Sequence, residues 1–121
     1  EIPNDYQFKM ALAQAYLGLK QFDKAWPELE SARMENPESS DVYLYRGIYY
    51  YNKQNYDKAV EDLEKSIKLN TENAYAYYYA GMSYLEKKMP AKMVEVFRIF
   101  LELVPGAPEA PEVKILVDAN C

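Results

Sequence analysis

The side chains of this chain that could take part in chemistry are mainly carboxylates. Glu61, Asp62 and Glu64 lie close together in the sequence, and two adjacent carboxylates can divide the roles of general acid and general base. Lysines alternate with these carboxylates, and on a helix the side chains would point in different directions, so a solvated face is the better interpretation. The sequence has no histidine, which excludes Ser-His-Asp triads, Cys-His pairs and histidine-ligated metal ions.

Two further kinds of chemistry are also excluded by the residue inventory. The four glycines are scattered and form no phosphate-binding loop. Cys121 is the one cysteine, so an internal disulfide is impossible, and no neighbouring residue would activate its thiol. We therefore predict a protein that is not an enzyme and has no cofactor and no metal ion.

Composition indicates a single soluble domain. The chain has 121 residues, of which 50% are hydrophobic and 27% charged, which is typical of a globular protein. A net charge of -5 disfavours nucleic acid and anionic membranes as partners, and no apolar run is long enough to insert into a membrane. Because the chain starts without Met, we expect a segment of a longer protein, and its compartment, cytoplasmic or periplasmic, stays open.

Tyrosines that recur every 34 residues reveal how the chain is organised. Tyr16, Tyr50 and Tyr84 hold the same position in three successive segments. The same register carries Ala13, Gly47 and Gly81, then Leu29, Leu63 and Phe97, then Pro37, Thr71 and Pro105. A fixed period with this many matches indicates one supersecondary unit used three times.

Each unit is predicted to contain two helices joined by a short turn. In the second unit, N-cap candidates at 39–41 precede the first helix, and Asp57 is expected to begin the second. In the third unit, Asn73 is the expected N-cap and Pro90 the expected first residue of the second helix, where a missing N–H costs nothing.

These positions resemble the signature of the tetratricopeptide repeat, W-x2-L-G-x2-Y…A-x3-F…P. The middle repeat matches at Tyr43, Gly47, Tyr50, Ala59 and Leu63, the third at Tyr77, Ala80, Gly81, Tyr84, Phe97 and Pro105, and the first at Leu12, Ala13, Tyr16, Ala25, Leu29, Ala32 and Pro37. The resemblance implies an all-α fold, a right-handed α-solenoid of three helix–turn–helix repeats at about 6–39, 40–73 and 74–107. Together with a capping helix at about 109–120, they would form one domain over 1–121.

Departures from the pattern indicate where the array ends. Lys9 stands where the later repeats have a tyrosine, and a charge is tolerable there only if no earlier repeat packs against it. Phe100 stands where the earlier repeats have a small residue, so we expect no following repeat to approach closely. Residues 109–120 have an apolar stripe without the tyrosine and small-residue positions of a repeat, so we interpret them as a cap.

One stripe of each first helix, opposite the tyrosine–glycine stripe, is left for a ligand. The resemblance implies that these helices line the concave side of the superhelix and that such positions carry ligand contacts. The candidate groove residues are Met10, Gln14, Leu44, Tyr45, Ile48, Tyr51, Tyr75, Tyr78, Tyr79 and Met82. We expect Tyr45, Tyr75 and Tyr79 to converge on one face with their rings largely accessible, because a cluster of exposed aromatic residues usually marks an interaction site.

The charge of the groove positions restricts the ligand. Similar repeat proteins that hold chaperone C-termini have a clamp of Lys, Asn, Asn, Lys and Arg, and the matching positions here are Met10, Gln14, Tyr45, Tyr75 and Tyr79. None is basic, so capture of carboxylates lacks its counter-charge. We therefore predict a non-catalytic protein–protein interaction module, a scaffold or adaptor that binds a peptide segment through aromatic and apolar anchors.

Three alternatives stay open. The same face could pair with a second copy of the chain, giving a homo-oligomer. The chain could be a non-catalytic domain of a larger protein, or the aromatic surface could be covered by neighbouring sequence.

Overall fold

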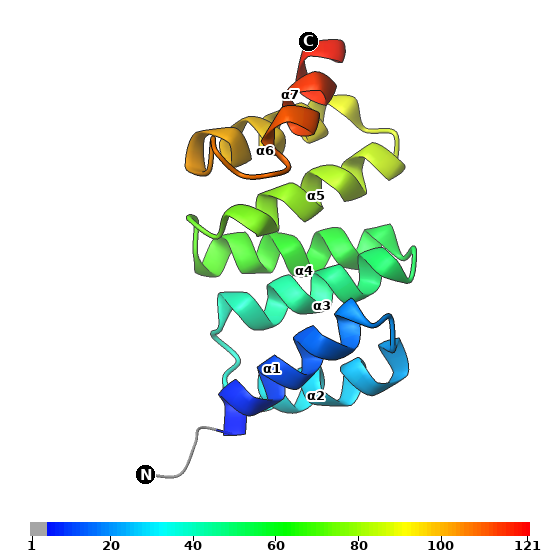
Figure 1. Cartoon of the computed structure of the whole chain (residues 1–121), viewed down its shortest axis with the longest axis vertical. Coiled ribbons are helices and arrows are strands. Elements are labelled where there is room, and N and C mark those ends of the chain that lie inside the picture. Colours follow the sequence, from blue (N-terminus) through cyan, green and yellow to red (C-terminus); the bar gives the residue numbers. More distant parts are fainter. Residues whose placement is uncertain (1–4) are drawn as a thin grey trace.

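The computed structural model describes residues 5–121 and leaves the starting residues Glu1-Ile2-Pro3 outside the described range. The described residues form seven α-helices joined by short turns. The helices are α1 (Asp5–Gly18), α2 (Phe22–Glu35), α3 (Ser40–Asn52), α4 (Tyr56–Leu69), α5 (Ala74–Glu86), α6 (Pro90–Leu103) and α7 (Ala110–Ala119). They stack along the long axis of the molecule from α1 at one end to α7 at the other (Figure 1). The predicted all-α solenoid is confirmed.

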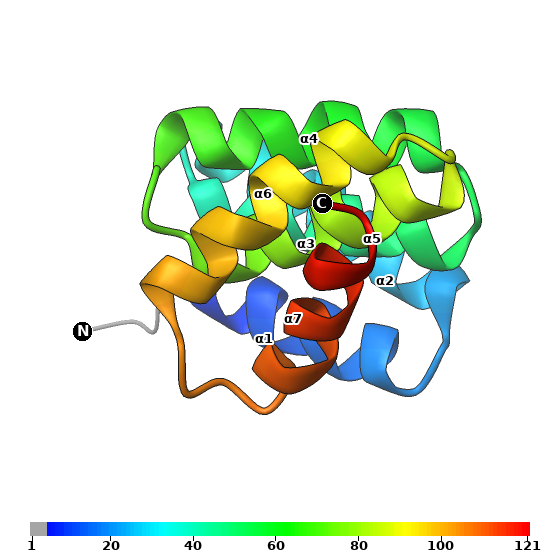
Figure 2. The same ribbon diagram turned by 90° about the horizontal axis from the view of Figure 1, so that it is seen from above.

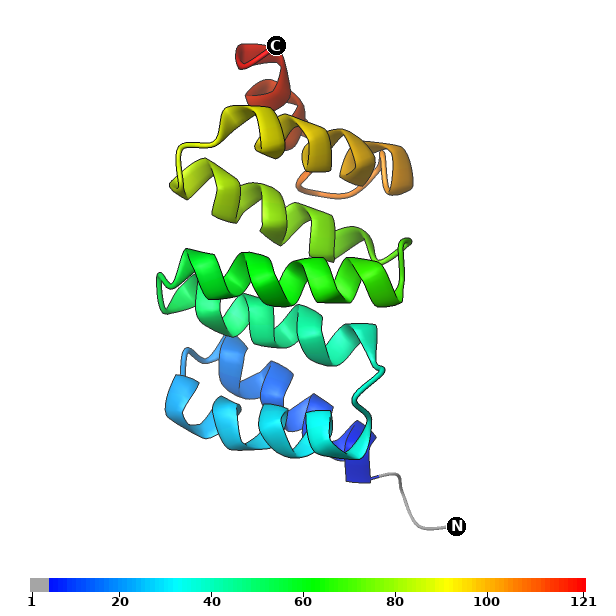
Figure 3. The same ribbon diagram turned by 180° about the vertical axis from the view of Figure 1, so that it is seen from behind.

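The helices lie in two layers of unequal packing. The first helices of successive repeats contact one another, α1 with α3 and α3 with α5, whereas the second helices in the described range contact only their neighbours along the chain. The layer of α1, α3 and α5 is therefore the inner one, where the stack is more tightly packed. Figure 2 shows α4 on the opposite side of the molecule from α1 and α7, and Figure 3 shows the layer of α2, α4 and α6.

Glycines set the closest approach within the second and third helix pairs. A Cβ atom added to Gly47 would lie 2.5 Å from Cγ of Leu63, and one added to Gly81 would lie 2.2 Å from the Phe97 ring. Real Cβ atoms do not approach other carbons so closely, and an added side chain in such a core causes overpacking. The signature glycine is therefore required by packing rather than by backbone conformation.

The turn inside each repeat has the same geometry three times. Lys20, Gln54 and Lys88 have positive φ angles of 60°, 64° and 59°. The amide that follows each of them donates to the carbonyl of the signature tyrosine, for example from Asn55 to Tyr50 at 2.9 Å. This is the Schellman arrangement at a helix C-terminus, here built without the usual glycine.

Helix starts agree with the expected caps, with two corrections. Ser39 caps α3 and accepts from the Val42 amide, and α6 begins at Pro90. The start of α4 is Tyr56, one residue before the predicted Asp57, because the Asn55 side chain is the cap.

The second correction concerns Asn73, which precedes α5 but does not cap it with its side chain. Its amide instead donates to Ser40 Oγ at 2.8 Å and to Asp41 Oδ1 at 3.2 Å. Asn73 therefore ties α5 to α3, which is a contact between repeats rather than a local helix signal.

The apolar core of the described residues is divided into a small and a large cluster. The small cluster contains Met10, Ala13, Leu29, Ala32 and Val42. The large cluster runs from α3 to α7 and includes Leu63, Tyr77, Phe97, Phe100 and Val113 among its buried members. Since Phe100 is fully buried and α7 packs on α6, α7 covers the end of the large cluster.

A group of buried charges lies beside the small cluster. Arg46 Nε of α3 lies 3.5 Å from Glu30 Oε2 of α2 and 3.4 Å from Asp62 Oδ2 of α4. The guanidinium also lies over the Trp26 ring, 5.3 Å from its centroid. At the start of the stack, Lys9 forms an ion pair with Glu35, so this charge is satisfied within the first repeat.

Candidate functional site

A pocket of about 360 Å³ lies between α3 and α5 on the inner layer. It is lined by Asp41, Leu44, Tyr45, Ile48, Asn73, Tyr75 and Tyr79. The spacing of three and four residues puts the α3 members on one helix face, and Tyr75 and Tyr79 are likewise one helical turn apart on α5. Five of the predicted groove residues therefore meet in one place.

The tyrosine rings of the inner layer contact one another in a chain. Tyr51 of α3 meets Tyr79 of α5 with ring centroids 5.9 Å apart, and Tyr79 meets Tyr78 at 5.1 Å, both edge to face. Tyr75 meets Tyr78 at 6.0 Å in the same manner. Aromatic pairs prefer this geometry, so the rings hold each other in place before any ligand is present.

The expectation that these rings are largely accessible is wrong. Tyr45, Tyr75 and Tyr79 are each half-buried, because neighbouring rings cover their edges. Tyr78 contacts the buried rings of Phe97 and Phe100, with centroids at 6.2 and 5.3 Å, and is therefore partly a core residue.

The remaining predicted residues are more scattered. Met10 and Leu44 are buried, at 6% and 5% exposure, so they support the groove from below and offer little surface to a ligand. Met82 is half-buried against the large cluster. Gln14 is exposed on α1 and does not line the pocket.

Three polar residues belong to the site although the predicted set omitted them. Asp41 lines the pocket and accepts from Asn73, and Glu109, which directly precedes α7, accepts from the Tyr75 hydroxyl at 2.8 Å. Asp41 begins the same 3,4,3 stripe as Ile48, so its spacing offered a signal. No local pattern indicated Asn73 or Glu109, since both act on a helix of another segment.

The pKa values of the groove tyrosines are raised, and the causes describe the local field. Burial is the main cause for Tyr45, Tyr51, Tyr78 and Tyr79, and it raises the pKa of Tyr78 to about 12. For Tyr75 the hydrogen bond to Glu109 is the main cause, because it stabilises the neutral hydroxyl. All five hydroxyls are therefore neutral near pH 7 and can act as hydrogen-bond donors.

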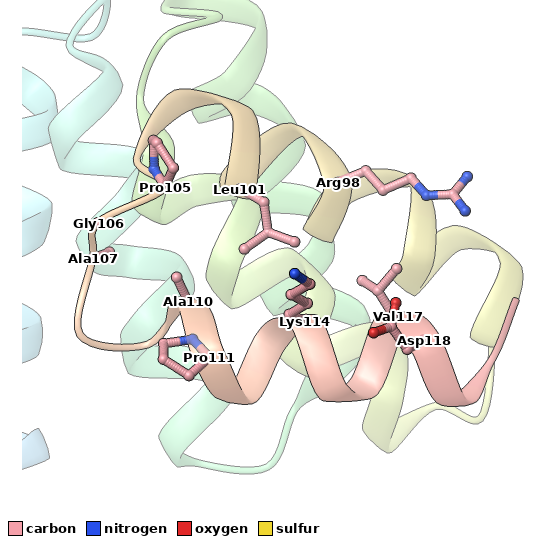
Figure 4. Close-up of a pocket in the computed structure, with 10 residues that line it drawn as sticks. All are labelled: Arg98, Leu101, Pro105, Gly106, Ala107, Ala110, Pro111, Lys114, Val117 and Asp118. Atoms are coloured by element: carbon pink, nitrogen blue, oxygen red, sulfur yellow. The ribbon is translucent and has the colours of Figure 1, made fainter.

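The largest pocket lies elsewhere, between α6, the following loop and α7, with a volume of about 770 Å³ (Figure 4). Leu101 of α6 and Val117 of α7 point into this space, with Arg98, Lys114 and Asp118 at its edge. Its lining has no aromatic ring, whereas aromatic anchors dominate binding surfaces. We therefore regard the smaller tyrosine pocket as the better candidate.

Two searches of the described residues gave no further site. Residues 5–121 contain no group of three or more Cys, Asp or Glu side chains placed to hold a metal ion. In the same range, no helix has the length and apolar character that crossing a membrane requires.

Comparison with protein families identifies the class of the chain. Models of the tetratricopeptide repeat match residues 40–73 and 75–107, together more than half of the sequence. The chain belongs to the tetratricopeptide repeat family. The first repeat, at about 6–39, lies outside both matches, and its assignment rests on the same helix–turn–helix geometry of α1 and α2.

Solved structures share the fold at low sequence identity. The TPR domain of Arabidopsis OM64 matches with a TM-score of 0.88 and 19% identity over 96% of each chain. The Yersinia enterocolitica chaperone SycD, in complex with a peptide of the translocator YopD, matches with a TM-score of 0.85 and 18% identity, over 98% of this chain and 95% of that one.

The TPR2B domain of yeast Sti1, in a complex with pHsp70, matches with a TM-score of 0.84 and 17% identity over 94% of each chain. No sequence among the curated proteins matches. At these identities the structural matches establish the fold of the chain.

Proposed function

We propose that this chain is a protein–protein interaction module that binds a peptide segment of a partner protein in the groove between α3 and α5. The observation that carries the proposal is the convergence of Tyr45, Tyr75 and Tyr79 around one pocket on the inner layer. Half-buried rings that are already held by their neighbours lose little freedom when a ligand binds, which favours affinity.

The related structures support a binding role rather than a catalytic one. The family consists generally of interaction modules, and both SycD and the TPR2B domain of Sti1 were solved in complex with a partner or a partner peptide. A groove with aromatic anchors and a few polar groups suits an amphipathic helix or an extended segment.

The test uses random dodecapeptides displayed on phage, selected on the wild type and then measured by fluorescence anisotropy. In the variant Tyr45→Ala/Tyr79→Ala, affinity should fall by about 100-fold or more, because central aromatic anchors contribute about 2 kcal/mol each. A matched control is Phe8→Ala/Ile115→Ala, which removes two apolar side chains that are 62% and 68% exposed outside the groove. Its affinity should stay at the wild-type level.

A second readout does not depend on the folding of a variant. NMR chemical-shift changes in the wild type on addition of the selected peptide should centre on Tyr45, Ile48 and Tyr79. Changes centred on the α6–α7 pocket would overturn the proposal. So would a dimer whose formation in sedimentation experiments requires the same two tyrosines, because the groove would then bind a second copy of this chain.

A further inference from the structure

The groove is surrounded by carboxylates. Asp41 lines the pocket, and Glu109 accepts from Tyr75. Glu86 and Glu112 also lie near enough to help raise the pKa of groove tyrosines by their negative charge. No Lys or Arg of the described range contributes to the pKa shifts of the five groove tyrosines. The field in the groove is therefore negative.

The cations of the chain cover tyrosines of a different set. Lys58 lies over the Tyr50 ring at 5.8 Å, and Lys92 lies over the Tyr84 ring at 5.9 Å, at the equivalent position one repeat later. A ring face attracts a cation because its π electrons are negative. None of the five groove tyrosines receives such a cation from residues 5–121. Their ring faces and the nearby carboxylates thus share an unfilled preference for positive charge.

On the basis of the function proposed above, we infer that the groove selects a cationic segment of its partner, with a Lys or Arg side chain placed in the pocket between α3 and α5. The charged end of that side chain pairs with Asp41, whose carboxylate is held by Asn73 at 3.2 Å. Its aliphatic stem lies along Ile48 and the ring of Tyr45, since long basic side chains bury their methylene groups on apolar surface. Apolar residues of the partner on either side contact the remaining rings.

This arrangement is the reverse of a carboxylate clamp. A clamp uses basic groove residues to hold an acidic ligand, whereas this groove places acidic residues beside neutral tyrosines. Charge of opposite sign across an interface selects partners and fixes their register. An acidic peptide would meet repulsion from Asp41 and Glu109 at the same positions.

The test begins with phage-displayed dodecapeptides selected on the wild type and counter-selected on Tyr45→Ala/Tyr79→Ala. Peptides that require the groove should be enriched in Lys and Arg over the unselected library. The best of them is then synthesised with its basic residue kept or replaced by Gln. The basic form should bind about tenfold more tightly, and its advantage should shrink as salt is raised.

Asp41→Asn removes the pocket charge and keeps the shape of the side chain. In this variant the advantage of the basic peptide should fall to about threefold or less, while the Gln peptide binds as before. Glu61→Gln is the matched control, because it removes an exposed carboxylate from α4 in the outer layer. It should leave the tenfold difference intact.

The possible outcomes separate the two proposals. Groove-dependent peptides without basic enrichment, or an equal loss for both peptide forms in Asp41→Asn, would overturn the cationic preference and leave the interaction module standing. If no peptide depends on Tyr45 and Tyr79, both proposals fail together.

Discussion

The junction between the first and second repeats differs in chemistry from the junction between the second and third. At the first junction, Arg46 lies between the carboxylates of Glu30 and Asp62. The residues 34 positions later are Ala80, Glu64 and Val96. There the glutamate accepts a hydrogen bond from the Tyr84 hydroxyl at 2.7 Å, and the places of the arginine and the aspartate are taken by apolar side chains.

This difference divides the stack into unequal halves. The large apolar cluster extends from α3 to α7, whereas the small cluster next to the charges has five buried members. Buried ion pairs seldom add stability, because the loss of hydration offsets their attraction. We therefore expect the first repeat to open more readily than the third. The pocket between α3 and α5 borders the large cluster, so the candidate site is built on the more stable half.

The largest predicted effect comes from removing the central charge of the first junction. Arg46→Leu leaves two buried carboxylates without their counter-charge, and an isolated buried charge is costly. The free energy of unfolding, measured with urea, should fall by about 3 kcal/mol. Leucine itself suits this position, since Leu12 occupies it in the first repeat.

The double variant Arg46→Ala/Asp62→Val is the matched control, because it installs the residues of the third repeat. Glu30 keeps its pair with Arg33 at 3.1 Å. This variant should recover most of the stability lost by Arg46→Leu. If it is less stable than the single variant, the charges contribute more than the apolar arrangement and the comparison of the junctions is wrong.

A second prediction concerns the close helix approach in the third repeat. Gly81→Ala places a methyl group 2.2 Å from the fully buried Phe97 ring. We expect a loss of about 2 kcal/mol in thermal unfolding, even though Ala favours helix by about 1 kcal/mol over Gly. Ala13 shows that the first repeat already accommodates a methyl group at this position.

Gly18→Ala is the control for helix propensity, since its added Cβ would meet nothing within 4 Å. This variant should be as stable as the wild type or slightly more stable. Equal melting temperatures for both substitutions would mean that the third repeat is no more tightly packed than the first.

The smallest effect is a pH dependence at the first junction. Burial raises the pKa of Asp62 from 3.8 to about 6, although Arg46 acts in the opposite direction. Between these two values the folded chain binds a proton that the unfolded chain does not, so stability rises as pH falls. Lowering the pH from 7 to 5 should add about 1 kcal/mol through this group.

Other carboxylates titrate as well, so the relevant quantity is a difference between two proteins. Asp62→Asn cannot titrate at this position, and its free energy of unfolding should gain about 1 kcal/mol less than that of the wild type over the same pH range. Parallel pH profiles would show that Asp62 is solvated in the folded chain.

Much of the helical framework was predictable because its causes are local. The cap at Ser39, the start of α6 at Pro90 and the 34-residue register depend on residues within one or two helical turns. The expected stripe on α3 also holds, since Tyr45 and Ile48 line one pocket. The exposure of Met10 and Leu44 was not predictable in this way, because it depends on helices that lie far away in the sequence.

The sequence by itself determined the repeat, the family and the position of the inner helices, since periodic apolar patterns specify which helix faces must be buried. Only the tertiary structure decided how the repeats meet. The bond from Tyr75 to Glu109 and the bridge of Asn73 to α3 join segments more than 30 residues apart. Such contacts depend on the distance and angle between neighbouring helix pairs, which no single helix pattern encodes. The same geometry brings Arg46 between two carboxylates and leaves the groove tyrosines half-buried beside Asp41.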